Sequence, residues 1–229
     1  MSRQLSLVVR RRITKPRTRS GPWIMDKQLH QQAVKDIASF TGCVDTDERL
    51  PGHPVVGVNL DRSLATDSVL GSLKNLVALH YLKLSQTRVT DKIMEVLRVH
   101  PEIKRLDISD TGVTDIGLKY LKYGKALEEL YLGSKITDAG FRYVKSLTKL
   151  RVLALEFTDV SDLGLRNIQS LVELECLFVS SRQVSNTSIR CLKKLPRLQT
   201  IQLLAVGDLA AGPALSQLKE SLPNVRVEW

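Results

Sequence analysis

Residues 103–118 read Ile-Lys-Arg-Leu-Asp-Ile-Ser-Asp-Thr-Gly-Val-Thr-Asp-Ile-Gly-Leu, and the chain repeats this motif along most of its length. The motif consists of Leu-x-x-Leu-x-Leu, a Thr or Ser, Val-Thr-Asp and a short apolar segment, and clear copies begin at Leu79 and Leu150. The copies start at residues 55, 79, 103, 127, 150, 174, 198 and 222, at intervals of 24 residues with one interval of 23. A fixed period of this length predicts a solenoid in which neighbouring repeats stabilise one another.

Each repeat contains one segment with the pattern of a short strand and one with the pattern of a helix. Leu82 and Leu84 alternate with other residues, so both leucines fall on one face of a strand. Stacking one strand per repeat gives a parallel sheet. Apolar pairs three residues apart predict helices that face the same core. These pairs are Leu70/Leu73, Met94/Leu97, Leu118/Leu121, Phe141/Val144, Leu165/Ile168 and Ile189/Leu192.

A Thr-Asp, Ser-Asp or Ser-Asn pair precedes each predicted helix. The pairs lie at 66/67, 90/91, 114/115, 137/138, 161/162 and 185/186. Such side chains accept hydrogen bonds from the free N–H groups of a helix start. One aspartate per repeat therefore indicates helix caps rather than a carboxylate cluster for metal binding or acid–base chemistry.

The ends of the chain depart from the repeat. Residues 1–24 contain seven basic residues and no acidic one, and the remainder contains 27 basic and 24 acidic residues. This composition predicts a basic, disordered tail. The alternatives are a mitochondrial presequence, a contact for nucleic acid or anionic lipid, and upstream residues from a wrongly assigned start. Residues 25–54 predict an N-terminal cap of a helix and a strand, and residues 55–229 the array, with Val225, Val227 and Trp229 alternating as a last strand.

The motif resembles that of the leucine-rich repeat family, in the short α/β style of ribonuclease-inhibitor-like arrays and of bacterial Thr-x-Val-Thr-Asp-x-Gly-Leu repeats. The resemblance implies an α/β fold, a right-handed solenoid with strands on its concave side, and a role in protein recognition. Family members often carry Asn or Cys where this chain has a hydroxyl, so we expect these hydroxyls to satisfy buried backbone groups between repeats. The positions are Ser63, Thr87, Thr111 and Thr158.

The strand alternation also predicts which side chains point outward on the concave side. One row is Gly57, Tyr81, Arg105, Glu129, Val152, Cys176, Thr200 and Asn224, and the next is Asn59, Lys83, Asp107, Tyr131, Ala154, Phe178, Gln202 and Arg226. In the N-terminal half, Tyr81, Lys83, Arg105, Asp107 and Glu129 make a polar surface on which Lys83 can pair with Asp107 and Arg105 with Glu129. In the C-terminal half, Tyr131, Val152, Ala154, Phe157, Cys176 and Phe178 make a more apolar one. We expect this apolar half to anchor a partner protein.

The sequence contains no pattern typical of an enzyme or of a cofactor or metal site. His30, His53, His80 and His100 lie apart, as expected of surface or cap residues, and the three cysteines lack zinc-ligand spacing. The apolar runs are shorter than a membrane span. We therefore expect a non-enzymatic, cytoplasmic protein-binding scaffold, monomeric outside its complex. Its alternatives are a mitochondrial location, a nucleic-acid or membrane tether, and an F-box-like ubiquitin-ligase adaptor.

Overall fold

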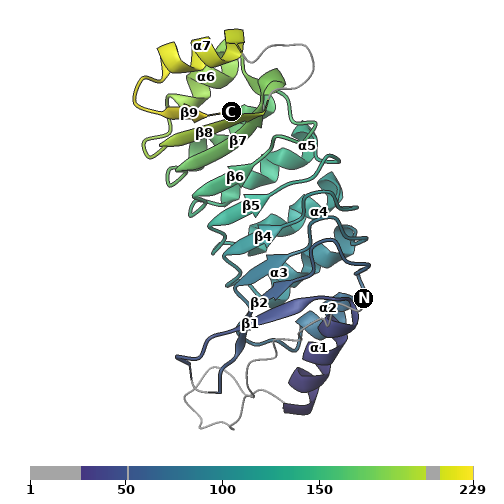
Figure 1. Cartoon of the computed structure of the whole chain (residues 1–229). Helices are drawn as coiled ribbons and strands as arrows, with labels where there is room; N and C mark the ends of the chain where they lie inside the picture. Colours follow the sequence, from purple (N-terminus) through teal and green to yellow (C-terminus); the bar gives the residue numbers. More distant parts are fainter. Residues whose placement is uncertain (1–26, 51, 205–211, 229) are drawn as a thin grey trace, which may run out of the picture.

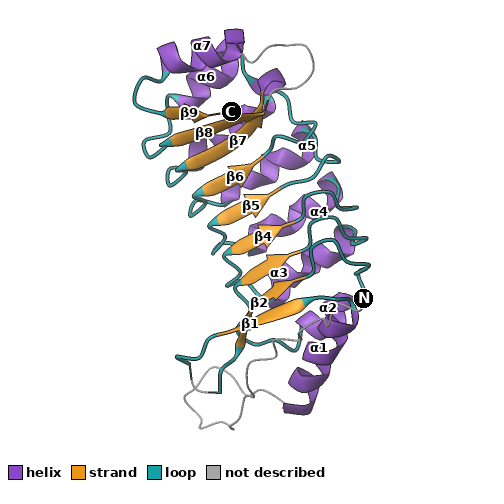
Figure 2. Cartoon of the chain, viewed as in Figure 1, coloured by secondary structure: helices purple, strands orange, loops and turns teal. Residues whose placement is uncertain are grey.

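The computed structural model describes residues 27–50, 52–204 and 212–228. Nine strands stack in sequence order into one sheet, with the helices behind them (Figures 1 and 2). Strands β2 to β9 are all parallel. The predicted α/β solenoid is confirmed over these residues. The predicted basic tail at residues 1–24 lies outside the described residues, as does Trp229.

A helix and a β-hairpin stand before the first full repeat. Helix α1 (Lys27–Ser39) packs against α2 (Val69–Leu73), with Ala33 and Ile37 buried. Strand β1 (Cys43–Thr46) pairs antiparallel with β2 (Val55–Asn59). Because an end repeat has only one neighbour, this helix and hairpin cover core that would otherwise meet water.

The remaining strands are three to five residues long. They are β3 (Tyr81–Lys83), β4 (Arg105–Asp107), β5 (Glu129–Tyr131), β6 (Val152–Ala154), β7 (Cys176–Ser180), β8 (Thr200–Leu204) and β9 (Arg226–Glu228). From β2 to β8 the predicted neighbours pair in register.

At β9 the predicted register is wrong by two residues. Thr200 pairs with Arg226 and Gln202 with Glu228, instead of with Asn224 and Arg226. The backbone N–H of Leu222 donates to the carbonyl of Leu218, so Leu222 follows directly on helix α7 (Gly212–Ser221) and does not start a repeat. This last repeat is longer than 24 residues, and its strand begins later.

Most repeats have a short helical segment that is partly 3₁₀. These are η1 (Asp91–Glu95) with α3 (Val96–Val99), α4 (Asp115–Leu118) with η2 (Lys119–Tyr123), α5 (Asp138–Phe141) with η3 (Arg142–Ser146), η4 (Gly164–Ser170), and η5 (Ser181–Gln183) before α6 (Asn186–Leu192). A 3₁₀ helix rises about 2.0 Å per residue against about 1.5 Å for an α-helix. It therefore spans the same height with fewer residues.

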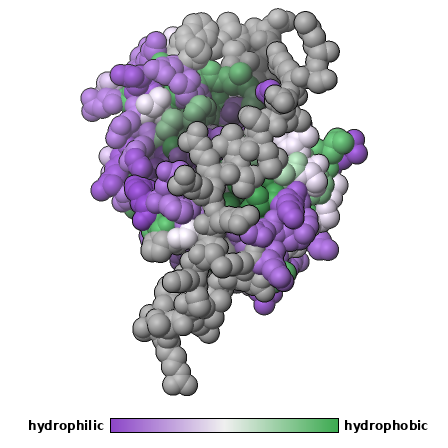
Figure 3. Space-filling view, turned by 60° about the horizontal axis from the view of Figure 1, so that its bottom comes forward, coloured by the Kyte–Doolittle hydropathy of each residue, from purple (hydrophilic) through white to green (hydrophobic). Residues whose placement is uncertain are grey.

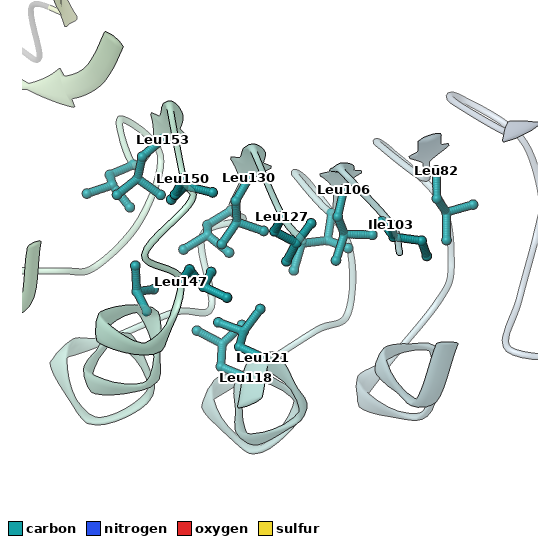
Figure 4. Close-up of a cluster of buried hydrophobic side chains, with 14 of the residues drawn as sticks. Leu82, Ile103, Leu106, Leu118, Leu121, Leu127, Leu130, Leu147, Leu150 and Leu153 are labelled. Atoms are coloured by element: carbon teal, nitrogen blue, oxygen red, sulfur yellow. The ribbon is translucent and has the colours of Figure 1, made fainter. Parts of the chain in front are cut away.

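The core is a continuous layer of leucines between sheet and helices. Figure 4 shows Leu118 and Leu121 rising from a helix towards Leu127 and Leu130 under the strands. All the helix residues predicted to face inward are buried, with at most 4% of any side chain exposed. Burying a leucine contributes roughly 1.5 to 3 kcal/mol. Since each repeat shares these contacts with the next, the array is stabilised as a whole.

The Thr-Asp pairs do more than the predicted capping. Thr114 caps its own helix by accepting from the N–H of Ile116. The aspartate instead reaches the next repeat: Asp91 accepts from the N–H and hydroxyl of Thr114. Equivalent bonds join Asp67 to Thr90, Asp115 to Thr137 and Asp138 to Ser161. Asp162 accepts from the hydroxyl of Ser185, whose N–H donates instead to Ser188. These aspartates are inter-repeat bridges.

The buried hydroxyls act differently from the prediction. Thr87, Thr111 and Thr158 each donate to the carbonyl three residues earlier in their own repeat, at 2.6 to 2.8 Å. They satisfy buried carbonyls, but those of their own repeat, and among the described residues only Thr158 of the three also bonds to the next repeat. Gln183 makes the longer connection, because its amide donates to the carbonyl of Val160 at 3.0 Å and the hydroxyl of Thr158 at 3.3 Å.

Candidate functional site

The outward-pointing side chains of β2 to β9 form one continuous surface, which we call the strand face. Three rows cross it. The first is Gly57, Tyr81, Arg105, Glu129, Val152, Cys176, Thr200 and Arg226; the second is Asn59, Lys83, Asp107, Tyr131, Ala154, Phe178, Gln202 and Glu228. A third row, at the strand ends, includes Ser109, Gly133, Glu156 and Ser180, two residues beyond the second. Adjacent members lie about 4.8 Å apart along the sheet.

On the polar half, three side chains from two neighbouring strands form a compact cluster. Arg105 pairs with Glu129 at 3.0 Å, and its guanidinium carbon lies 5.0 Å from the ring centre of Tyr131. The hydroxyl of Tyr131 donates to Glu129 at 3.1 Å. Burial raises the pKa of Tyr131 to about 12, with Glu129 and Asp107 adding to the rise and Arg105 opposing it. The cluster is thus a carboxylate and an aromatic ring engaged by one arginine, whose Nε is buried without a hydrogen-bond partner. Tyr131, predicted to belong to the apolar half, is part of this polar cluster instead.

The second pair predicted on this half does not form. Asp107 accepts from the backbone N–H of Ser109 at 3.0 Å and from its hydroxyl, and it belongs to none of the ion pairs among the described residues. Lys83 lies beside it in register. Tyr81, at the N-terminal end of the row, is 44% exposed.

The C-terminal half carries half-buried groups without charge. Val152, Cys176 and Phe178 are half-buried, and Phe157, in the turn after β6, is 54% exposed. Ala154 is only 4% exposed, so its predicted exposure is wrong. Its methyl group lies between Tyr131 and Phe178 in the sheet register, and these longer side chains stand on either side of it.

The sequence interpretation missed Glu156, which continues the outward alternation of Val152 and Ala154 one step past the strand. Its Oε2 is buried and has no hydrogen-bond partner. Burial raises the pKa of this carboxyl, backbone hydrogen bonds oppose the rise, and the charge of Asp107 adds to it. The signal was available, because a Glu stands where other repeats have Ser109 or Gly133.

Comparisons with known proteins agree with this architecture. A family model described as "Leucine Rich repeat" matches residues 101–122, which span β4 and α4. One strand and one helical segment recur in register on both sides of that match. The fold is a leucine-rich repeat solenoid. The crystal structure of an internalin C2 from Listeria monocytogenes is similar, with a TM-score of 0.49 and 21% identity over 72% of this chain and 77% of that chain. No curated protein matches.

Across residues 27–50, 52–204 and 212–228, no group of three His, Cys, Asp or Glu residues could hold a metal ion, and no helix is long and apolar enough to cross a membrane. His100 was expected to be a surface or cap residue but is buried within the array, with Nε2 2.9 Å from the carbonyl oxygen of Leu73. Burial lowers its pKa.

Hydrophilic side chains cover much of the array's outer surface. Viewed towards the N-terminal end, they dominate both sides of the visible described surface, with smaller apolar areas between them (Figure 3). Against that background, Phe178 is half-buried on β7 and Phe157, in the turn after the neighbouring β6, is 54% exposed.

Proposed function

We propose that this leucine-rich repeat protein is a non-enzymatic scaffold that binds a partner protein through its strand face. The observation that supports the proposal is the change in character along that face. Arg105, Glu129 and Tyr131 satisfy one another on the polar half, whereas Val152, Cys176 and Phe178 leave apolar surface partly open. Aromatic side chains held on a rigid sheet are typical anchors of protein interfaces.

The chemistry of Cys176 favours binding over catalysis. Burial raises the pKa of its thiol, and the carboxylates of Glu228 and Glu156 raise it further. A thiol in this environment stays protonated near neutral pH and is a weak nucleophile. Cys176 therefore serves this surface as a small apolar side chain.

The test is a crosslinked pull-down with matched aspartate substitutions. Phe157 and Leu163 are equally exposed, at 54%, but Leu163 precedes η4 on the helical side. Phe157→Asp and Phe178→Asp should abolish capture of the wild-type partner and leave the circular dichroism melt nearly unchanged. Leu163→Asp should leave capture intact. Folded Phe157→Asp and Phe178→Asp proteins that kept the same partners would rule out the strand face.

A second candidate function rests on the charge of residues 1–24, seven basic and no acidic. A segment of this composition can tether the chain to nucleic acid or anionic lipid. Such binding weakens steeply as salt rises and is lost when those residues are deleted, whereas an apolar strand-face contact survives both changes.

Our proposed location is cytoplasmic, and amino-terminal sequencing of the mature chain distinguishes it from a mitochondrial protein with a cleaved presequence.

A further inference from the structure

The open half of the strand face contains a carboxylate with one buried oxygen that the described residues leave without a hydrogen-bond donor. Glu156 belongs to none of the ion pairs among the described residues, and its buried Oε2 accepts no hydrogen bond. The charged side chain that acts on it is Asp107, which carries the same sign. Backbone hydrogen bonds at residues 155 and 156 favour the charged form of the carboxyl, but its second oxygen has no donor, and burial there removes water that nothing replaces.

The neighbours of Glu156 are a small residue and a large ring. Gly133 stands beside it in the row towards the N-terminus and puts no side chain next to the carboxylate, since a methyl group there would lie 3.1 Å from the carbonyl oxygen of Ile108. Phe178 pairs with Ala154, two residues before Glu156, and so lies on the diagonal of Glu156 across adjacent strands. Diagonal neighbours lie about 7 to 8 Å apart, within reach of an aromatic or long side chain.

The polar half shows how this sheet satisfies the same pair of groups. There Glu129 and the ring of Tyr131 are both engaged by Arg105, which pairs with one and lies over the other. In the row that supplies Arg105, the open half has Val152 and Cys176, and neither can donate to a carboxylate as a cation. The open half therefore has the carboxylate and the ring without the cation.

Resting on the proposed function, we infer that the partner protein places an arginine or lysine side chain on Glu156, with its aliphatic stem or guanidinium plane against Phe178. A carboxylate turns about its terminal torsion at little cost, so Oε2 can rotate to meet an incoming donor. Guanidinium and ammonium groups bind both carboxylates and aromatic faces, and these bonds strengthen when water is excluded. The partner's cation would thus do for Glu156 and Phe178 what Arg105 does for Glu129 and Tyr131.

The test uses random 12-residue peptides displayed on phage and selected on the full wild-type chain. Affinities of the selected synthetic peptides are then measured by fluorescence anisotropy with wild type, Glu156→Gln, Phe178→Asp and Glu102→Gln, an exposed glutamate before β4. Peptides blocked by Phe178→Asp should carry arginine or lysine and should bind Glu156→Gln at least about tenfold more weakly. Glu102→Gln should bind them as wild type does.

A double-mutant cycle identifies the contact. Replacing the peptide's arginine by citrulline, or its lysine by acetyl-lysine, should cause the same loss as Glu156→Gln, and the two changes together should lose little more. If the peptides whose binding Phe178→Asp blocks contain no arginine or lysine, or bind Glu156→Gln as tightly as wild type, this inference is overturned and the proposed function is not. A selection without any peptide blocked by Phe178→Asp contradicts both. If a synthetic peptide of residues 1–24 displaces the selected peptides as well as they displace one another, the site binds the chain's own tail, and the inference of a partner's cation is overturned.

Discussion

The carboxylate of Asp91 accepts hydrogen bonds from the backbone N–H of Thr114 at 2.7 Å and from its hydroxyl at 2.8 Å, joining two successive repeats. The same carboxylate accepts from the N–H of Gly117 at 2.9 Å. This contact explains why the same residue types recur at these positions of the motif in this chain. The threonine supplies two donors, the aspartate reaches forward to receive them, and the glycine gives the carboxylate room.

Asp91→Asn should destabilise the fold by roughly 1 to 3 kcal/mol, because an amide brings N–H groups against the N–H groups that the carboxylate receives. Urea denaturation measures the loss as a lower midpoint. The matched change Asp110→Asn removes the same charge from an exposed residue whose backbone φ of 51° asparagine readily adopts, and should be nearly neutral. Equal effects of the two substitutions would mean that the bridge contributes nothing.

Gly140→Ala should destabilise the array by about 1 to 3 kcal/mol, since the added methyl group would lie 2.3 Å from Oδ1 of Asp115 and 2.6 Å from its Cα. Gly71→Ala is the control. Its methyl group would meet nothing within 4 Å inside α2, and alanine favours a helix by up to about 1 kcal/mol over glycine. Thermal melts should therefore shift in opposite directions, and a stabilised Gly140→Ala would refute the close approach.

Leu106→Ala should lower the free energy of unfolding by roughly 2 to 5 kcal/mol by opening a cavity in the shared core. Leu106 is fully buried between Leu82 and Leu130 in the sheet register. Val172→Ala, at a side chain that is 46% exposed, removes apolar atoms near the surface and should cost far less. An unchanged denaturation midpoint for Leu106→Ala would contradict the register of the repeats.

Glu156→Gln should stabilise the free protein at neutral pH. The pKa of Glu156 in the folded chain is raised above its ordinary value of 4.5, so the folded state holds the proton more tightly than the unfolded state. Wild-type stability from this group therefore falls as pH rises from about 4.5 through the folded pKa, whereas glutamine does not ionise. The difference in melting temperature between variant and wild type should be largest near pH 7 and shrink below pH 4.5. A difference that stayed constant with pH would contradict burial of the charge.

The motif was sufficient to predict the sheet, because strand alternation and the 24-residue interval pair Leu82 with Leu106 on adjacent strands. It could not predict the register of β9, since helix α7 lengthens the last repeat. No residue near Arg226 indicates that it pairs with Thr200. Apolar pairs three residues apart predicted the positions of the helical segments but not their 3₁₀ character, which follows from the height that each repeat must span.

The rows of the strand face were predictable, and the partners of their side chains were not. Arg105 and Glu129 pair as expected, but Asp107 turns to Ser109, a bond within its own strand end that competes with Lys83. Ala154 is buried by its larger neighbours, which alternation alone does not measure. The sequence predicts Asp91 and Thr114 as helix caps because both residue types cap helices, and it does not predict the two hydrogen bonds that Thr114 donates to Asp91.

Isothermal titration calorimetry of a captured partner with wild type, Phe178→Asp and Leu163→Asp tests the strand-face interface most directly. Phe178→Asp should weaken binding by roughly 30-fold or more, the loss of an interface anchor, because a charge replaces a partly buried ring. Leu163→Asp should bind within about twofold of wild type, as expected for a residue outside the interface. Equal affinities for Phe178→Asp and wild type, with both proteins folded, would contradict the account.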